Sequence, residues 1–294
     1  MKKQFVGYAF ISPWLIGFII FTAFPFLSSV YLSFTRYNIV QNPVWVGLAN
    51  YRTLFSGDPI FWHSLNATLI FAVAAVPLGV IAGVGLALLL NSNVGGIGVY
   101  RTIFFLPSIV PVVAGSIVFL SVLNPNIGLV NRLLKAGFGV TGPNWLQDPT
   151  WAVVTLVMLS LWGVGGSMVI YLAGLKDIPA HLYEAARIDG ANAFQRLRHI
   201  TLPMLTPVIF FNLVMGLIGV FQYFTQAYVF QQAMVNQGGA PDSIHFYALY
   251  LFERAWRYMD MGYASAMGWV LFLVIMGITG ILFAGQKKWV HYEN

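Results

Sequence analysis

The sequence predicts an all-α membrane protein with six transmembrane helices, and three observations support this fold class. First, 59% of the 294 residues are hydrophobic and only 8% are charged, whereas a soluble domain carries about 25% charged residues. Second, the apolar residues form long runs, such as the 32 residues without Asp, Glu, Lys or Arg between Lys3 and Arg36. Third, the short alternating segments typical of an outer-membrane barrel are absent from the sequence.

The apolar runs place six spans in one transmembrane domain that covers residues 1–294. We expect the spans near residues 6–33, 68–90, 103–123, 151–172, 204–230 and 263–284. Each is about as long as a helix that crosses the hydrocarbon core, and backbone groups inside lipid must bond within their own segment. Lys2 and Lys3 would suit a signal peptide, but the run that follows is longer than a signal core, so we interpret it as a retained span.

The basic residues indicate the orientation. Six spans put both termini on one side, which carries nine Lys and Arg residues against six on the other. This bias favours cytoplasmic termini. The net charge is +6, and the basic residues flank the apolar runs. We therefore expect membrane lipid, and not nucleic acid, as the anionic partner.

The residues that are missing also narrow the function. No ionisable side chain lies at the centre of a predicted span, whereas proton- or ion-driven carriers usually need one. The sequence has no phosphate-binding loop, no H-E-x-x-H motif and no cysteine, and its histidines lack ligand spacing. We therefore expect no enzymatic activity, no metal and no cofactor bound by this chain. A transport channel of this kind needs a separate motor, while a scaffold or receptor without transport remains the alternative.

The densest charge cluster lies between spans four and five, in residues 175–203. Gly190 predicts the end of one short helix and Asn192 the cap of a second. Leu202-Pro203 should break the second helix just before span five. An amphipathic helix resting on lipid headgroups would be the ordinary interpretation of such a loop. The apolar face that we expect on the first helix comprises Leu182, Ala185, Ala186 and Ile188.

The same segment resembles the EAA signature of the membrane subunits of binding-protein-dependent ABC importers. That signature is Glu-Ala-Ala, three residues, Gly, nine residues, Ile, one residue, Leu-Pro, and this chain keeps every spacing from Glu184 to Pro203. Leu197 departs from the Phe of many relatives but stays hydrophobic. The resemblance implies the type I ABC importer fold, with this segment as a cytoplasmic coupling helix that docks on the ATPase. The implied coupling residues are Glu184, Ala185, Ala186, Asp189, Gly190, Leu202 and Pro203.

The resemblance also implies a set of partners and a location. The family works in the bacterial inner, or plasma, membrane with both termini cytoplasmic. It pairs this chain with a second, different permease, two ATPase subunits that bind ATP and Mg, and an extracytoplasmic solute-binding protein. The loop of residues 237–260 is a candidate contact for the binding protein, and a solvated loop is the alternative.

Three other stretches resemble the carbohydrate-uptake branch of the family: SPWLIGFIIFTAFPFLSSVYLSFTRYN, VGLANYRTLF, and NPNIGLVNRLL with NWLQDP. This implies an oligosaccharide, disaccharide or polyol phosphate as substrate. The end of span five mixes amides with aromatic rings, and amides bond hydroxyls in both directions. We expect Gln222, Tyr223 and Gln226 to face the pathway, with an interfacial aromatic belt as the alternative.

Similarity to the maltose importer of this branch adds three pathway positions, Ser108, Gly163 and Gly166. The glycines around Gly163 allow close helix packing, and a hinge is the alternative interpretation. Thr225 stands where many relatives carry Asp, so the sugar itself is not identified.

Overall fold

The computed structural model describes residues 2–92, 94–235 and 239–291, and these residues are mostly helical. Four helices in the described residues are long and apolar enough to cross a membrane: Phe10–Ser33, Pro59–Leu90, Ala193–Met234 and Met261–Gln286. Two pairs of bent helices raise the count to six if each pair forms one span. The all-α class is confirmed. The chain divides into two compact units, residues up to 62 with 250–274 and residues 63–249 with 275–294.

The first unit contains the N-terminal helices, a two-stranded ribbon and part of the last helix. The strands pair antiparallel, with Thr35 opposite Trp45. The indole of Trp269 donates a 3.2 Å hydrogen bond to Ser29 and packs against Phe26, with ring centroids 4.9 Å apart. The elements of this unit are α1 (Lys2–Phe18), the π-helical turn η1 (Ile19–Ala23), α2 (Phe24–Ser33), β1 (Thr35–Arg36), β2 (Val44–Trp45), α3 (Ala49–Ser56), the start of α4 (Pro59–Leu90), the second half of α14 (Tyr247–Phe252), η5 (Glu253–Arg257) and the first half of α15 (Met261–Gln286).

Asp58 organises the polar part of the first unit. One carboxylate oxygen accepts the backbone N–H groups of Ile60 and Phe61 at 3.0 and 3.1 Å, and so caps α4. The other oxygen accepts the hydroxyls of Tyr250 and Tyr263, both at 2.5 Å. Burial raises the pKa of Asp58, but these four hydrogen bonds outweigh burial and hold the pKa below its ordinary value of 3.8. The carboxylate thus ties the start of α4 to α14 and α15.

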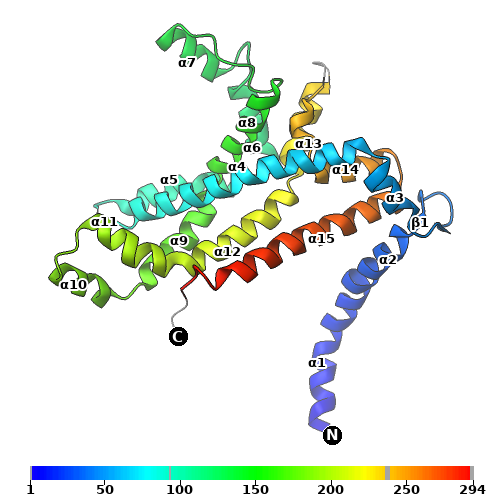
Figure 1. Cartoon of the computed structure of the whole chain (residues 1–294), viewed down its shortest axis with the longest axis horizontal. Helices are drawn as coiled ribbons and strands as arrows, with labels where there is room; N and C mark the ends of the chain where they lie inside the picture. The colour runs from blue at the N-terminus through cyan, green and yellow to red at the C-terminus, as the bar shows by residue number, and fades with distance from the viewer. Residues whose placement is uncertain (1, 93, 236–238, 292–294) are drawn as a thin grey trace. The chain divides into compact units, whose positions relative to one another are not determined.

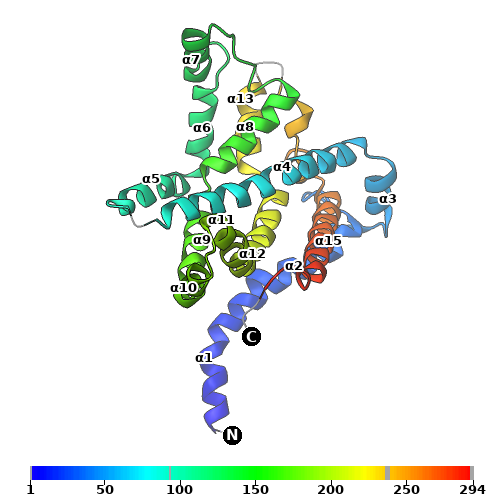
Figure 2. The ribbon, with the colours of Figure 1, turned by 60° about the vertical axis from the view of Figure 1, so that its left-hand side comes forward.

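The second unit holds the remaining helices. α9 packs against both α5 and α12, and α13 lies beside α6 (Figure 2). One apolar cluster surrounds Phe71, Leu156 and Phe230, and another surrounds Met168 and Leu205. Figure 1 labels the α-helices of this unit. Its elements are the rest of α4, α5 (Ile97–Ile109), α6 (Val112–Val122), α7 (Leu129–Phe138), α8 (Pro149–Trp162), α9 (Gly165–Asp177), α10 (Ala180–Ile188), α11 (Ala193–Arg196), the π-helical turn η2 (Leu197–Thr201), α12 (Leu202–Phe221), α13 (Thr225–Met234), η4 (Asp242–Ile244), the first half of α14 and the end of α15.

The expected third and fourth spans are not straight helices. α5 and α6 meet at 97°, and α8 and α9 meet at 48°. Proline explains the first bend, because it disfavours the helical region for the residue before it. Val110, which precedes Pro111, accordingly has φ −65° and ψ 129°. The second bend falls at Gly163 and Val164. Residues 103–123 and 151–172 therefore each correspond to a broken pair.

The expected helix break at Leu202-Pro203 is wrong. Helical turns run without interruption from Ala193 to Phe221. A proline inside a regular α-helix removes one hydrogen bond and clashes with the carbonyl four residues earlier. Here the preceding turn, η2, is a wider π-helical turn that makes room for the ring. The N-terminal helix repeats this arrangement, because η1 precedes Pro25.

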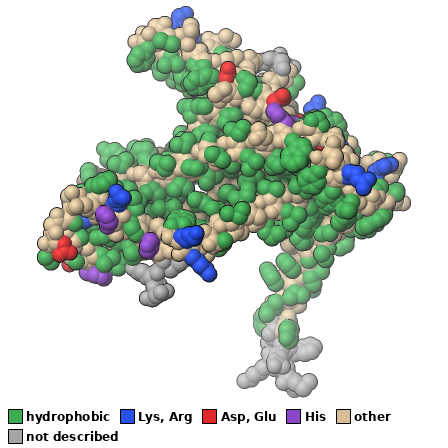
Figure 3. Space-filling view, in the orientation of Figure 1, with side chains coloured by type: hydrophobic (Ala, Val, Ile, Leu, Met, Phe, Trp, Pro, Cys, Tyr) green, Lys and Arg blue, Asp and Glu red, His purple; other side chains and the backbone are tan. Residues whose placement is uncertain are grey.

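Apolar side chains cover much of the visible surface (Figure 3). In the first unit, the apolar window of 18 residues within Phe10–Ser33 has no buried residue. Phe10 and Phe21 are 82% and 80% exposed. A soluble monomer rarely exposes a continuous apolar surface of this kind, so the surface suits a lipid environment or a protein partner.

Candidate functional site

The segment between α9 and α12 contains a sharp corner built by local backbone chemistry. Gly190 has φ +77°, a left-handed conformation that glycine adopts without strain. Its N–H donates to the carbonyl of Arg187 at 3.1 Å, and the N–H of Ala191 donates to the carbonyl of Ala186 at 2.8 Å. These two bonds form a Schellman motif, which ends α10. The expected stop at Gly190 is confirmed.

The next helix, α11, begins at a capping box. The side chain of Asn192 accepts the backbone N–H of Gln195 at 2.9 Å, and the side chain of Gln195 accepts the N–H of Asn192 at 2.8 Å. Two backbone donors that the helix leaves free are thereby satisfied. The expected cap at Asn192 is confirmed, so both sides of the Gly190 corner are fixed within a few residues.

The corner presents most of the expected coupling residues to the surface. Glu184, Ala185, Asp189 and Gly190 are exposed, and Ala186, Leu202 and Pro203 are half-buried. Because Glu184 is exposed, a partner could reach its carboxylate directly.

The apolar face of α10 differs from the expected one. Leu182 packs inward against the cluster around Met168 and Leu205, so it does not join the exposed face. The neighbouring Tyr183 hydroxyl lies 3.0 Å from the Thr201 hydroxyl in η2, which holds this side of α10 against the start of α12.

The outward apolar contacts are Ile188 and Phe194, which are 87% and 68% exposed. Phe194 was missed because sequence reasoning looked for an apolar face on α10 alone. The signal that could have identified Phe194 is a lone aromatic residue in the first turn of the capped helix that follows the corner. Behind the corner lies a cavity of about 340 Å³ lined by Ala186, Asp189, Gly190, Ala191, Gln195, Arg196, His199 and Ile200.

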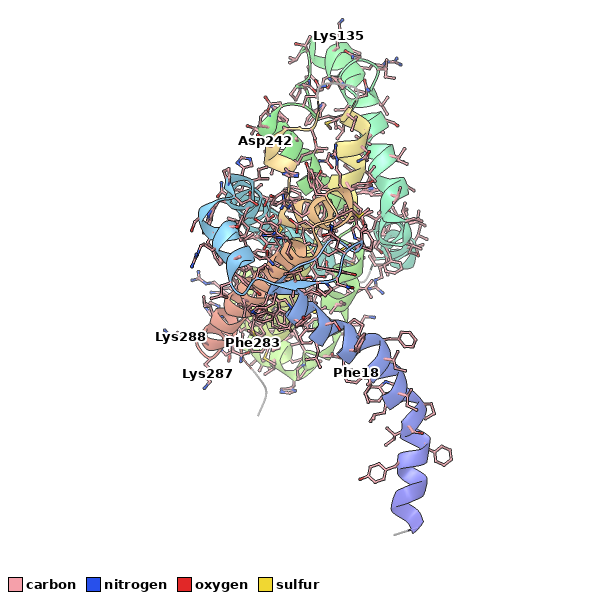
Figure 4. All side chains as sticks on the ribbon, turned by 90° about the vertical axis from the view of Figure 1, so that its right-hand side faces the viewer. Phe18, Lys135, Asp242, Phe283, Lys287 and Lys288 are labelled. Atoms are coloured by element: carbon pink, nitrogen blue, oxygen red, sulfur yellow. The ribbon has the colours of Figure 1, made fainter. Side chains whose placement is uncertain are left out.

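The C-terminal segment meets the same end of α12. The backbone N–H of His291 donates to the Thr206 hydroxyl at 2.9 Å. The ring of Phe210 lies 5.0 Å from that of Phe283 and 5.9 Å from that of Trp289. Figure 4 shows Lys287 and Lys288 close to Phe283 at the end of α15. The basic C-terminal residues and the coupling segment thus share one end of the second unit.

Three of the expected pathway residues line one cavity at the bends of the broken helices. Ser108, Gly163 and Gln226 come from three different segments and line a cavity of about 220 Å³, which we call the bend cavity. Trp162 adds an aromatic ring and Ser160 a hydroxyl. The other lining residues are Pro107, Val110, Val112, Gly115 and Leu159, so the described lining carries no charge.

Two adjacent glycines set the approach of α9 to α5. A Cβ at Gly165 would overlap the backbone of Phe104 and Phe105, so only glycine fits there. A Cβ at Gly166 would lie 4.0 Å from the Cβ of Ser108, an ordinary contact. Gly166 is therefore beside the bend cavity without lining it. The glycine cluster lies at a bend and at a close helix contact, which supports the packing interpretation, while the hinge stays a prediction.

The other two expected pathway residues, Tyr223 and Gln222, lie in different surroundings. Tyr223 lies beside the bend cavity, with its hydroxyl 3.5 Å from the Ser160 hydroxyl and its ring 4.7 Å from that of Phe71. Gln222 is exposed in the short break between α12 and α13 and does not line the bend cavity. In the described part of the chain, no group of three His, Asp or Glu side chains is placed to hold a metal ion.

Comparison with known proteins gives a family match and relatives that align with nearly all of this chain. Residues 75–289 match the family described as binding-protein-dependent transport system inner membrane component. The chain is 46% identical to YesP, a probable ABC transporter permease protein of Bacillus subtilis (strain 168), over 100% of this chain and 94% of that protein. It is 34% identical to LacF, a lactose transport system permease protein of Rhizobium radiobacter, over 96% of this chain and 94% of that protein.

A solved structure has the same fold. It is described as a bacterial alginate ABC transporter in complex with alginate pentasaccharide-bound periplasmic protein. The two chains superpose with a TM-score of 0.85 and 23% identity, over 98% of this chain and 96% of that chain.

Proposed function

The chain belongs to the family of binding-protein-dependent transport system inner membrane components, and on that premise we propose that it forms one half of the translocation path of an ATP-driven carbohydrate importer. As a permease of this family it is a multi-pass protein of the inner membrane and is not itself a catalyst. The proposed partners are a second permease subunit, two ATPase subunits that bind ATP and Mg, and an extracytoplasmic solute-binding protein.

One observation carries the proposal: a single helical run links the coupling corner to the bend cavity. The run from Ala193 begins beside Gly190 and ends at Phe221, five residues before Gln226. Tyr183 and Thr201 tie α10 to the start of this run. A helix transmits displacement along its axis, so movement of the corner by an ATPase subunit would shift the wall of the cavity.

Glu184 is the charged residue that we assign to docking. It is exposed on α10 among small side chains that allow close approach. Ile188 and Phe194 add apolar surface on the two sides of the corner. An exposed carboxylate beside apolar anchors suits a partner cleft that offers a basic group and an apolar floor.

The chemistry of the bend cavity supports a carbohydrate. Gln226 can donate to and accept from hydroxyls, Ser108 and Ser160 add hydroxyl groups, and Trp162 offers a ring for the apolar face of a sugar. LacF, to which the chain is 34% identical, is a permease of a lactose transport system and points to the same class of substrate.

We further propose that both termini lie in the cytoplasm. The C-terminal segment meets the same end of α12 as the coupling segment, through His291 and Thr206. An ATPase reaches only the cytoplasmic side, so this end of the second unit would face it. The unburied apolar window within Phe10–Ser33 would then contact lipid or the second permease.

The test is uptake by the complete importer reconstituted in vesicles. A panel of radiolabelled lactose, maltose, trehalose, raffinose, an arabino-oligosaccharide and glycerol 3-phosphate is offered through the binding protein, with and without ATP. We expect ATP-dependent accumulation of one neutral sugar class, and Gln226→Leu should raise its half-saturation concentration about tenfold, the effect of one lost polar contact. Accumulation that an ion gradient drives without ATP, or no accumulation of any sugar, would refute the proposal.

A further inference from the structure

The helix α7 and its flanking residues form an exposed apolar surface at one end of the second unit. They lie in the connection between the two broken helix pairs, at the opposite end of the unit from α10 (Figure 2). Residues 127–140 contain two basic residues, Arg132 and Lys135, and no acidic residue. Apolar side chains there that are each more than half exposed are Ile127, Leu129, Leu133, Phe138 and Val140. Exposed apolar residues that gather beside basic ones indicate an interaction surface.

Asn131 fixes which side of α7 faces the rest of the unit. Its amide donates to the carbonyls of Pro125 and Pro143 at 3.1 and 3.4 Å. Its side-chain oxygen accepts the indole N–H of Trp145 at 2.7 Å. Leu134 packs against the buried apolar cluster that contains Trp145. These contacts occupy the inward side of α7, so its exposed apolar residues must meet something other than the core of this chain.

The helical repeat divides the rest of α7 into a basic outer face and two apolar flanks. Leu129 and Leu133 are about one turn apart, and Phe138 follows Leu133 by five residues, which is roughly 140° around the helix. Arg132 and Lys135 project between these flanks, and Figure 4 shows Lys135 on the outer side of α7, away from the rest of the unit. A soluble partner that docks on one flank would leave the other in water, whereas lipid can surround both.

The neighbouring helices place α7 at the border of the hydrocarbon core. α6 ends at Val122 and α8 begins at Pro149, so α7 lies past the ends of both. Ile117 and Val118 of α6 are exposed, as lipid-facing residues of a span would be. Trp151, in the first turn of α8, is 38% exposed, and tryptophan side chains gather at membrane interfaces. α7 therefore lies where acyl chains meet the headgroups.

We propose that α7 lies in the extracytoplasmic interface of the membrane and binds anionic phospholipid. Leu129, Leu133 and Phe138 contact the acyl chains. Arg132 and Lys135 pair with the headgroup phosphates. This inference goes beyond the proposed function and uses its orientation, in which α10 is cytoplasmic and α7 lies on the other side. An anchored α7 would fix the outer ends of α6 and α8, against which the corner could move α12.

The natural absence of cysteine allows a direct test in the complete importer. Leu133→Cys and Phe138→Cys place single thiols on the two flanks of α7, and Asp242→Cys places one at an exposed polar position of η4 as the matched control. Each thiol carries a small environment-sensitive fluorophore. The importer is reconstituted in vesicles of phosphatidylcholine with phosphatidylglycerol or of phosphatidylcholine alone. Each kind of vesicle is prepared with and without lipid that carries a nitroxide near the headgroup end of its acyl chain.

We expect the nitroxide to lower the emission from positions 133 and 138 about twofold, with little effect at position 242. Quenching at 133 and 138 should be stronger in the vesicles that contain phosphatidylglycerol. The double variant Arg132→Gln with Lys135→Gln should remove that difference, because the anionic headgroups lose their basic partners. Quenching at 133 and 138 no greater than at 242, or equal quenching in both kinds of vesicle, would overturn the proposal.

Two further measurements separate lipid binding from a protein partner and from the orientation. Addition of the solute-binding protein should leave the emission at 133 and 138 unchanged, and a shift that appears only with this protein would assign the surface to it instead. On intact cells, a membrane-impermeant maleimide should label Asp242→Cys and not Glu184→Cys. Labelling of Glu184→Cys alone would refute the orientation in the proposed function. The expected sidedness without lipid quenching would refute only the role of α7.

Discussion

The coupling corner and the bend cavity lie in the same unit but are specified in different ways. The corner depends on neighbours in sequence: Gly190 supplies a left-handed conformation, and Asn192 and Gln195 cap the following helix. The bend cavity depends on segments far apart in the chain, since Ser108, Gly163 and Gln226 meet there only after folding. Local chemistry thus builds the surface that receives force, while long-range packing builds the space that holds the substrate.

Charge reversal at the corner should give the largest effect. Glu184→Lys should reduce uptake and substrate-stimulated ATP hydrolysis by more than tenfold, because a docked carboxylate would become a like charge against a basic partner. Both are measured in vesicles, with insertion checked by the amount of protein in the membrane. Glu184→Gln, which keeps the shape, should retain more activity than the lysine variant. Normal coupling in Glu184→Lys would remove the corner from the coupling path.

The adjacent glycines Gly165 and Gly166 test the long-range packing of α9 against α5 beside the bend cavity. Gly165→Ala should destabilise the protein by about 1–3 kcal/mol, because its Cβ would overlap the backbone of Phe104. Gly166→Ala should cost much less, because its Cβ would make an ordinary contact with Ser108. Thermal unfolding of the purified chain in detergent measures both. Equal stability of the two variants would show that α5 and α9 do not approach as closely as the structure shows.

A second pair of glycines tests whether ATPase coupling depends on the local geometry of the corner and not only on stability. Gly190 and Gly139 both follow a helix with positive φ, at +77° and +68°, and a Cβ would meet nothing within 4 Å at either. Alanine should cost about 1 kcal/mol at each site, because both positions strain a side chain in the same way. Only Gly190→Ala should also lower ATPase coupling. If Gly139→Ala lowered coupling as much, the effect would come from general instability and not from the corner.

Asp58 makes both local and long-range contacts, and its substitution should have the smallest effect on stability. Its folded pKa is lowered, so its contribution to stability is present above about pH 3.8 and is lost as the pH falls through the folded value. Asp58→Asn still caps α4 but lacks the charge that Tyr250 and Tyr263 donate to. Between pH 5 and pH 3, the melting temperature of the wild-type protein should fall, and we expect that of Asp58→Asn to fall less.

Asp148→Asn is the matched control for Asp58→Asn. Asp148 caps α8 through the backbone N–H groups of Thr150 and Trp151, and asparagine caps about as well as aspartate. An identical acid profile in both variants would show that the tyrosines add nothing to the Asp58 carboxylate.

The sequence predicted the parts of the fold that depend on local signals. Apolar runs indicated the spans, and Gly190 and Asn192 indicated where the helices end and begin, because these signals act within one turn. The break expected at Pro203 failed because the effect of proline depends on the turn before it, and a π-helical turn has no clear sequence signal.

The candidate cavities were only partly predictable for the same physical reason. Family resemblance led to Ser108 and Gly163, and the chemistry of span five led to Gln226, but nothing local indicated that they would meet. Gln222 carries the same amide as Gln226 yet lies exposed in the break after α12.

The central claim is that the Glu184 corner contacts the ATPase on the cytoplasmic side, and crosslinking tests it most directly. Glu184→Cys and Phe138→Cys place single thiols in this cysteine-free chain, at an exposed position of α10 and at an 80% exposed position of α7. A thiol-to-amine crosslinker is added to the complete importer. We expect a covalent product with the ATPase subunit from position 184 and none from position 138. A product from position 138, or none from either, would contradict it.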